Sequence, residues 1–374
     1  AMMRVCYVIP SLEIAGTERQ LLYLLQGLAR DCDLTVACTN RAGALAGEAR
    51  RAGARVMELG VCSGWDPSAW WKLRRVFEAH RPDVVHSFLF GFDLYANLAA
   101  RQTGVPVVIS SRRQLATWKK RRHLFIQRRA NQWVDCVVAN SRAVAEFAIA
   151  QERADPRLFR IIPNGIAPDL FIRRADPHGL RPRYNIPPCS RVVGIVANFS
   201  PVKDHGLFVR MAGELRRRRA DVHFLMVGIG PLVQSVESNL RARGLSDCFT
   251  RVASIADIAD LYALMDVSVL CSKAEGFPNA ILESMAASRP VVAAAVGGIP
   301  ELIADGDTGR LIASRDPGAF ADAVEWVLDH PEESRAMAAR GASFVQDHFS
   351  VERMVEGYRA LYAEFLEQTR WKDR

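Results

Sequence analysis

Short apolar runs rich in β-branched residues alternate with helix-like segments through the first half of the chain. The runs include RVCYVIP, DLTVACT, DVVHSFLF, VPVVISS and DCVVANS, and amphipathic stretches such as TERQLLYLLQGLA lie between most of them. Parallel neighbouring strands need a long crossover, usually a helix, whereas antiparallel strands need only a turn. The alternation therefore predicts a parallel sheet with helices on both faces.

The same alternation restarts after a proline-rich segment. Residues 163–190 contain six prolines, and the strand-like runs RVVGIVAN, VHFLMVGIG, DVSVLCS, PVVAAAV and GRLIAS follow them. We therefore expect an α/β protein with two Rossmann-like, doubly wound domains, at residues 1–170 and 190–350. Residues 171–189 are expected to form a linker and hinge. An amphipathic helix predicted over 351–374 is assigned to the first domain.

Two such domains facing each other would leave a cleft at the carboxyl ends of their strands, where open α/β sheets bind ligands. The loop KAEGFP follows the run DVSVLCS and precedes the helical stretch NAILESMAAS. Gly276 lets the backbone approach a ligand, and Asn279 can cap a helix whose N-terminal amides suit a phosphate. Glu275 and Glu283 flank this turn, and carboxylates there can accept hydrogen bonds from sugar and ribose hydroxyls.

This E-x7-E arrangement, within EGFPNAILESMAASRPVVAAAVGGIPELI, resembles the retaining glycosyltransferases of family GT4, which have the GT-B fold. Weaker similarities are LEIAGTERQL, DVVHSF, VVANS, IIPNG, VANFSPVKD and VGIGP. The resemblance implies a hexosyltransferase that moves a sugar from a UDP- or GDP-sugar to a small-molecule or lipid-linked acceptor, with retention of anomeric configuration. We expect no metal and no cofactor beyond the nucleotide-sugar donor.

The resemblance also implies roles for individual residues. Glu283 would bind the donor's ribose, while Glu275, Lys203 and His86 are the predicted catalytic residues, at the sugar, the diphosphate and the acceptor side. The other predicted donor-binding residues are Gly16, in a loop closing over the donor, Asn198, Ser200, Gly276, Phe277, Pro278, Asn279 and Ala280. Asn164 and Gly165 would mark the hinge. The structural alternatives are an exposed lysine for Lys203, a core histidine for His86 and a tight turn for Gly16.

Three positions depart from the family pattern. The first loop usually carries two glycines, whereas here it reads Ala15-Gly16. An arginine commonly precedes the lysine by a few residues, but Asn198 and Ser200 occupy those positions. Lys203 would then act with less help, or together with Arg112 or another arginine. Phe88 stands where the family often has a second histidine.

Positive charge is concentrated in the first half of the chain. Residues 1–180 carry 26 Lys+Arg against 16 Asp+Glu, whereas residues 181–374 carry 23 against 25, within an overall charge of +8. Residues 112–129 contain eight basic residues and no acid. We predict an acceptor or membrane side at Arg112, Lys119, Lys120, Arg121 and Arg122. The alternative is a solvated charged face whose apolar residues pack on the domain.

The sequence motifs of several other functional classes are absent. There is no C-x-x-C pair, no G-x-G-x-x-G, no P-loop and no G-x-S-x-G. No apolar run reaches the roughly 18–20 residues of a membrane span, so we expect a cytoplasmic protein, peripheral at most on the inner membrane face. The rival hypotheses are an epimerase or phosphorylase on the same fold, and a non-catalytic basic protein binding membrane or nucleic acid. Nucleic acid is not expected, because no recognised binding module is present.

Overall fold

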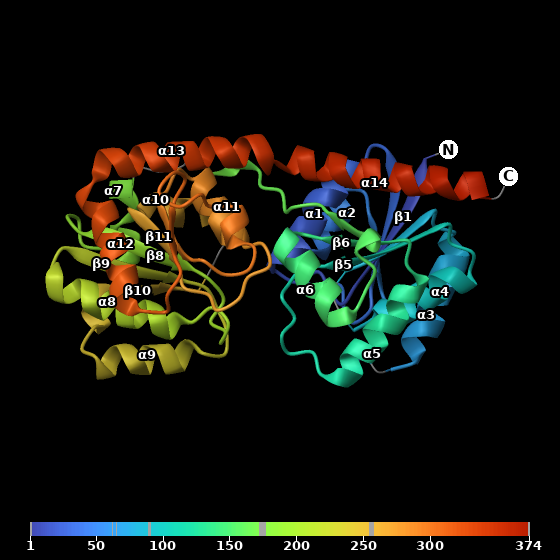
Figure 1. Ribbon diagram of the computed structural model, residues 1–374, viewed down its shortest axis with the longest axis horizontal. Coiled ribbons are helices and arrows are strands. Elements are labelled where there is room, and N and C mark those ends of the chain that lie inside the picture. Colours follow the sequence, from blue (N-terminus) through green and yellow to red (C-terminus); the bar gives the residue numbers. More distant parts are fainter. Residues whose placement is uncertain are drawn as a thin grey trace. The chain divides into compact units, whose positions relative to one another are not determined.

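The computed structural model describes residues 2–372, except 62, 65, 89–90, 172–176 and 254–257. The chain divides into two compact units, Ala1–Gly165 with Val351–Arg374, and Ile166–Ser350 (Figure 1). The division lies at residue 165 and not at the expected 170, because Ile166, Phe171 and Ile186 belong to the hydrophobic core of the second unit. The described part of the expected linker is therefore part of that unit.

Seven parallel strands form the sheet of the first unit, in the order β3-β2-β1-β4-β5-β6-β7. Their bounds are β1 (Met3–Ile9), β2 (Cys32–Cys38), β3 (Arg55–Glu58), β4 (Val84–Ser87), β5 (Val107–Arg112), β6 (Cys136–Ala139) and β7 (Phe159–Ile161). Successive side chains of a strand point to opposite faces of the sheet. In β1, Val5, Tyr7 and Ile9 enter the core on one face, while Cys6 and Val8 enter the core on the other.

Helices cover both faces of this sheet. The Tyr7 face packs against α1 (Gly16–Leu28), α2 (Ala46–Arg51) and α14 (Val351–Lys372). The opposite face packs against α3 (Ser68–His80), α4 (Asp93–Gln102) and α6 (Arg142–Glu152), with α5 (Arg121–Ala130) beside α4 and α6. Short 3-10 turns lie at Asn131–Trp133 and Pro156–Leu158.

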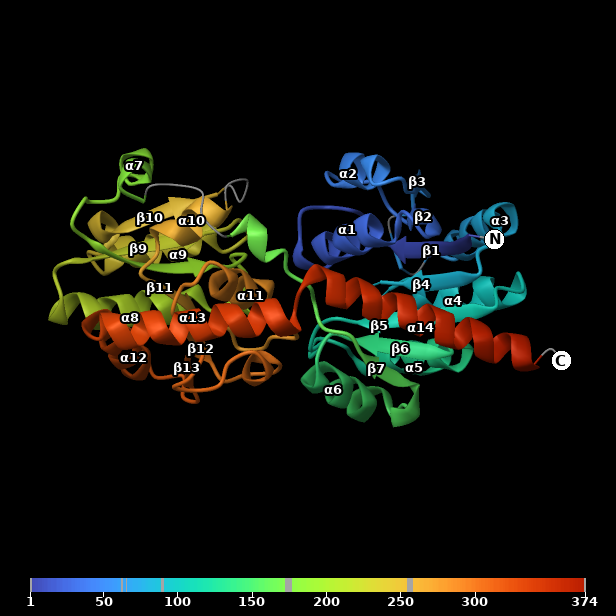
Figure 2. The ribbon, with the colours of Figure 1, turned by 90° about the horizontal axis from the view of Figure 1, so that it is seen from above.

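The C-terminal helix α14 is amphipathic, as its sequence predicts. Its buried residues recur at three- and four-residue steps and are Met354, Val355, Tyr358, Leu361 and Tyr362. Figure 2 shows this long helix lying along the first unit, and it packs on α1 and β5. Gly27 of α1 permits this packing, because a Cβ there would lie 2.4 Å from Cγ2 of Val355.

Six parallel strands form the second unit, in the order β10-β9-β8-β11-β12-β13. They are β8 (Arg191–Val196), β9 (Val222–Val227), β10 (Phe249–Val252), β11 (Val267–Leu270), β12 (Val291–Ala294) and β13 (Arg310–Ile312). The helices are α7 (Pro177–Leu180), α8 (His205–Arg218), α9 (Val233–Ala242), α10 (Ile258–Leu264), α11 (Asn279–Ala286), α12 (Pro317–Asp329) and α13 (Pro331–His348). Short 3-10 turns lie at Pro168–Leu170, Pro182–Tyr184, Ser246–Cys248 and Ile299–Glu301.

Both units therefore have the predicted doubly wound α/β architecture. In the second unit the chain builds β8, β9 and β10 toward one edge and then returns to build β11, β12 and β13 toward the other. The point of reversal, called the topological switch point, lies between β8 and β11. Within the described residues, no helix has the length and apolarity needed to cross a membrane.

Candidate active site

The loops that follow β8 and β11 meet at the carboxyl edge of the second sheet. β8 and β11 are hydrogen-bonded neighbours, and the Lys273 amide donates to the Val202 carbonyl across the two loops at 2.7 Å. Ligands of open α/β sheets bind at this switch point. The predicted residues Asn198, Ser200, Lys203, Glu275 and Gly276 all lie on these two loops.

Lys203 and Glu275 form an ion pair between the two loops. The Lys203 Nζ lies 2.5 Å from Oε1 of Glu275, and the Ser272 hydroxyl donates to the same oxygen at 2.5 Å. The Glu275 side chain is 9% exposed and that of Lys203 is 25% exposed, so the cation is the more accessible partner. The structure thus brings together the two residues for which the sequence predicts contacts to the sugar and the diphosphate.

A second ion pair supports the loop that carries Lys203. Asp204 has a left-handed backbone (φ 47°, ψ 54°), caps α8 by accepting a hydrogen bond from the Leu207 amide, and pairs with Arg315. Arg315 also donates to the Ser272 carbonyl at 2.8 Å. Loops from three different strands are thereby tied together beside Lys203. No sequence pattern singled out Asp204, Ser272 or Arg315, although Asp204 directly follows Lys203.

The neighbouring loop after β9 approaches the loop after β8 through glycine. Gly228 and Gly230 have φ values of +147° and +151°, and a Cβ on either would lie within 2.5 Å of a carbonyl oxygen of Ala197 or Phe199. These two glycines belong to the stretch VGIGP. Only glycine fits such an approach, so this motif lets the loops after β8 and β9 pack together.

Helix α11 begins at the turn that follows Glu275. Pro278 occupies the position preceding the helix and Asn279 is its first residue, so the expectation that Asn279 caps the helix is wrong. The turn enters the helix through the extended backbone of Pro278 (φ −75°, ψ 117°). The side chain of Phe277 is buried and packs edge-on against Phe349, at 5.3 Å between ring centroids. Phe277 therefore faces the core, and its backbone continues the loop.

Glu283 lies one turn into α11 and is half-buried. Its Oε2 lies 3.0 Å from the hydroxyl of Tyr262, a fully buried residue of α10. The Tyr262 hydroxyl also lies 3.1 Å from the Ala280 carbonyl. Nothing in the local sequence around Glu283 identifies Tyr262, because the contact joins two helices.

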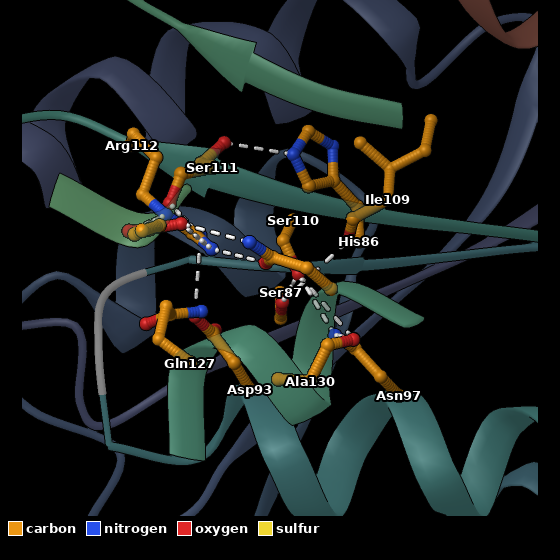
Figure 3. Close-up of polar contacts among 12 residues, drawn as sticks. His86, Ser87, Asp93, Asn97, Ile109, Ser110, Ser111, Arg112, Gln127 and Ala130 are labelled. Carbon is orange, nitrogen blue, oxygen red and sulfur yellow. Dashed lines mark hydrogen bonds and ion pairs between the residues drawn. The ribbon is translucent and has the colours of Figure 1, made fainter. Parts of the chain in front are cut away.

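Gly16, His86 and the predicted basic residues belong to the first unit. Gly16 is the first residue of α1, directly after β1 and its turn. His86 lies inside β4 and is fully buried, with its Nδ1 2.8 Å from the Tyr362 hydroxyl. Its Nε2 lies 2.8 Å from the Ser111 hydroxyl (Figure 3). Burial, with a smaller contribution from Arg113, lowers the pKa of His86 well below its usual range. These surroundings favour a core histidine, and its catalytic role remains a prediction.

Arg112 is not part of an exposed basic surface. It is 6% exposed and pairs with Glu152 at 2.9 Å and with Asp93 at 3.3 Å, within the buried polar network of Figure 3. Lys119 is also buried and lies 3.1 Å from Glu152. The expectation that these two residues form an accessible basic face is therefore wrong, because two carboxylates of the interior neutralise them.

Lys120, Arg121 and Arg122 are exposed at the start of α5, as the prediction requires. Two large apolar side chains are exposed beside them, Trp118 at 51% and Phe125 at 59%. The guanidinium of Arg129 lies 5.4 Å from the Phe125 ring centroid. We call Lys120, Arg121, Arg122 and Phe125, together with Trp118, the α5 surface.

Two doubly wound parallel-sheet units in one chain are the architecture of the GT-B glycosyltransferases. Two family models match the chain: a glycosyl transferase 4-like domain over residues 15–165, and glycosyl transferases group 1 over residues 190–330. The chain belongs to the family 4 glycosyltransferases.

Relatives and solved structures agree with this assignment. D-inositol 3-phosphate glycosyltransferase 2 of Catenulispora acidiphila is 32% identical over 53% of this chain and 48% of its own length. The corresponding enzyme of Stackebrandtia nassauensis is 29% identical over 71% and 66%. The chain thus spans about half to two thirds of the length of these relatives.

Two solved structures share the fold. Anabaena HepE, solved in complex with UDP and glucose, matches with a TM-score of 0.86 at 19% identity, over 97% of this chain and 100% of that chain. A glycosyltransferase from Rickettsia africae matches with a TM-score of 0.86 at 18% identity, over 98% and 99%. At these identities the likeness shows the GT-B fold alone.

Proposed function

We propose that this protein transfers a sugar from a nucleoside diphosphate sugar, UDP- or GDP-linked, to an acceptor, with retention of anomeric configuration. The observation that carries the proposal is the Lys203–Glu275 pair on the two loops of the switch point, 2.5 Å apart. HepE, a structural neighbour, has been solved with UDP and glucose, and the relatives are named glycosyltransferases, which supports a donor of this class.

Different residues of the second unit can bind different parts of the donor. The diphosphate would lie against Lys203 and the first turn of α11, where helix N–H groups carry partial positive charge. As the anomeric C–O bond breaks, its electron pair passes to the diphosphate oxygen, and a preorganised cation stabilises this negative charge. Glu275 would accept hydrogen bonds from the sugar hydroxyls and keep Lys203 in place. Glu283 would bind the ribose diol.

No metal is part of this proposal. Among the described residues, no group of three His, Cys, Asp or Glu side chains could hold a metal ion. Lys203 and the start of α11 supply positive charge instead. Turnover, measured as release of UDP or GDP from a panel of nucleotide sugars, should therefore persist in EDTA. Activity lost in EDTA and restored by magnesium would contradict this part of the proposal.

Binding of the donor can be tested without an acceptor. A nucleotide at about 100 times its dissociation constant should add roughly 2.7 kcal/mol to the free energy of unfolding, which a thermal-shift panel of UDP-, GDP- and ADP-sugars detects. A protein that binds none of these donors would contradict the proposal. Product analysis then separates a transferase from the rival enzymes, because an epimerase releases no nucleoside diphosphate and a phosphorylase consumes inorganic phosphate.

Replacement of Glu283 by alanine should weaken binding of the nucleoside diphosphate more than it affects folding. The change removes both carboxylate oxygens that would accept from the ribose hydroxyls, and hydrogen bonds to charged groups contribute roughly 1.5–3 kcal/mol. Calorimetric titration with UDP and GDP measures the effect. Glu333→Ala, at an exposed position of α13, is the matched control. Unchanged affinity in the Glu283 variant would show that the ribose lies elsewhere.

We further propose that the α5 surface contacts an anionic membrane, where a lipid-linked acceptor would be found. The exposed Lys120, Arg121 and Arg122 supply the charge, and Trp118 and Phe125 supply apolar side chains suited to the interface. Each basic residue near an anionic bilayer contributes about 1 kcal/mol, and the attraction fades within about 10 Å at 0.1 M salt.

The protein should therefore co-sediment with phosphatidylserine vesicles at low salt and dissociate as salt rises. Replacing Lys120, Arg121 and Arg122 by glutamine should reduce binding by about two orders of magnitude. The matched control is Arg30, Arg50 and Arg51→Gln, three exposed arginines on or next to α1 and α2, which lowers the net charge of +8 by the same three units. Equal losses in both variants, or equal binding to neutral vesicles, would favour a soluble acceptor.

A further inference from the structure

Tyr262 is fully enclosed in the hydrophobic core of the second unit, yet its hydroxyl reaches two polar groups of helix α11. Its ring is 0% exposed and packs edge-on against Phe171, at 6.0 Å between centroids and 66° between ring planes. A tyrosine in this position needs a partner for its hydroxyl, since an unpaired polar group in the core is destabilising. The partners are both on α11: the Ala280 carbonyl and the Glu283 carboxylate.

The hydroxyl acts as the donor toward both partners. A carbonyl and a carboxylate only accept hydrogen bonds, and a phenol carries one proton to share between them. Burial and the negative charge of Glu283 raise the pKa of Tyr262 well above its usual range, so the proton stays on the phenol. The hydroxyl therefore fixes one oxygen of Glu283 relative to the helix backbone at Ala280.

We propose that Tyr262 is a positioning residue that holds the Glu283 carboxylate in the orientation required to bind the vicinal diol of the donor's ribose. The inference rests on the proposed function, which assigns the ribose to Glu283. Binding two hydroxyls side by side requires a set orientation of the carboxylate plane, and a side chain with three rotatable bonds does not hold one by itself. Tyr262 supplies one such constraint from inside the core, without touching the donor.

Tyr262→Phe isolates this role, because it deletes one oxygen and keeps the ring in its packing. We expect UDP to bind about three- to tenfold more weakly, the size of one ordinary hydrogen bond. Binding of 2′-deoxy-UDP, which lacks half of the diol, should change much less. If the parent protein prefers guanine nucleotides, GDP and 2′-deoxy-GDP are the probes. Tyr358→Phe, which removes a buried hydroxyl from α14 in the first unit, is the matched control and should leave all four affinities unchanged.

A double-mutant cycle separates positioning from a general structural effect. In the Glu283→Ala background, Tyr262→Phe should have no further effect on UDP affinity. Equal weakening of UDP and 2′-deoxy-UDP, or the same loss in both backgrounds, would mean that Tyr262 acts only on packing and would overturn the inference. If Glu283→Ala itself leaves UDP and GDP affinity unchanged, both the assignment of the ribose to Glu283 and the inference about Tyr262 are wrong. If Glu283→Ala weakens binding but Tyr262→Phe does not, only the inference about Tyr262 is wrong.

Discussion

Replacement of Lys203 by alanine is expected to lower kcat by about a hundredfold or more, while the protein remains folded. Removal of one preorganised donor that stabilises charge in a transition state commonly has an effect of this size. Lys203 lies at the switch point and is the accessible member of its ion pair with Glu275, so its loss leaves the departing diphosphate without that cation. Initial rates of UDP or GDP release at saturating donor measure kcat directly.

Lys273→Ala is the matched control for this change. Lys273 lies two residues before Glu275, and its side chain is 59% exposed. Its replacement should leave kcat within twofold of the parent value, and both variants should keep the parent's melting temperature within a few degrees. Should Lys203→Ala also remain within twofold, the diphosphate contact would belong to another cation, and Arg315, whose guanidinium contacts the Ser272 carbonyl, would be tested next.

Replacement of Glu152 by glutamine is expected to destabilise the protein by about 3–5 kcal/mol, the cost of breaking a buried ion pair by removing one partner. Glu152 is 1% exposed and pairs with Arg112 and Lys119, which would remain buried without this carboxylate. Urea denaturation followed by tryptophan fluorescence is a suitable measurement, because six of the seven tryptophans lie in the first unit. Donor affinity, which depends on the second unit, should change little.

Glu146→Gln supplies the comparison on the same helix. Glu146 is exposed on α6, and surface changes of this kind usually alter stability by less than about 0.5 kcal/mol. A loss for Glu152→Gln as small as that for Glu146→Gln would mean that the network contributes no ionic stabilisation.

The ion pairs of Glu152 also predict how the stability of the protein depends on pH. Burial opposes ionisation of Glu152, but Arg112 and Lys119 outweigh it and lower the pKa of this carboxyl to about 2. A carboxyl with a depressed pKa stabilises the folded state above its unfolded pKa, near 4.3, and this contribution fades as the pH falls toward 2. The stability difference between the parent and Glu152→Gln should therefore be constant above about pH 5.5 and shrink below about pH 4.3.

The sequence predicted the architecture of both units well, because that information is local and periodic. The β-branched runs became β1, β2, β4, β5 and β6 in one sheet and β8, β9, β11 and β12 in the other. The spacing of apolar residues likewise predicted α14 and its buried face. The loop between β11 and α11 could be placed at the carboxyl edge of its sheet, because every parallel strand ends at the same edge.

The exposure of the basic segment, residues 112–129, could not be predicted from local sequence in this way. Eight Lys and Arg residues within residues 112–129 predict a charged face, and composition does not reveal which of them have buried carboxylate partners. Arg112 pairs with Asp93, which lies 19 residues away in the chain. Lys119 pairs with Glu152, which lies 33 residues away. Only Lys120, Arg121 and Arg122 of the five predicted residues remain exposed.

By itself, therefore, the sequence determined the fold class, the two-unit organisation and the loop that carries Glu275 and Glu283, since each depends on residues close together in the chain. Only the tertiary structure decided which groups surround them. Lys203 meets Glu275 across 72 residues, Tyr262 meets Glu283 from another helix, and His86 is enclosed by Tyr362 from the far end of the chain. Such contacts arise when separate strands and helices pack together, and no periodicity or local motif encodes them.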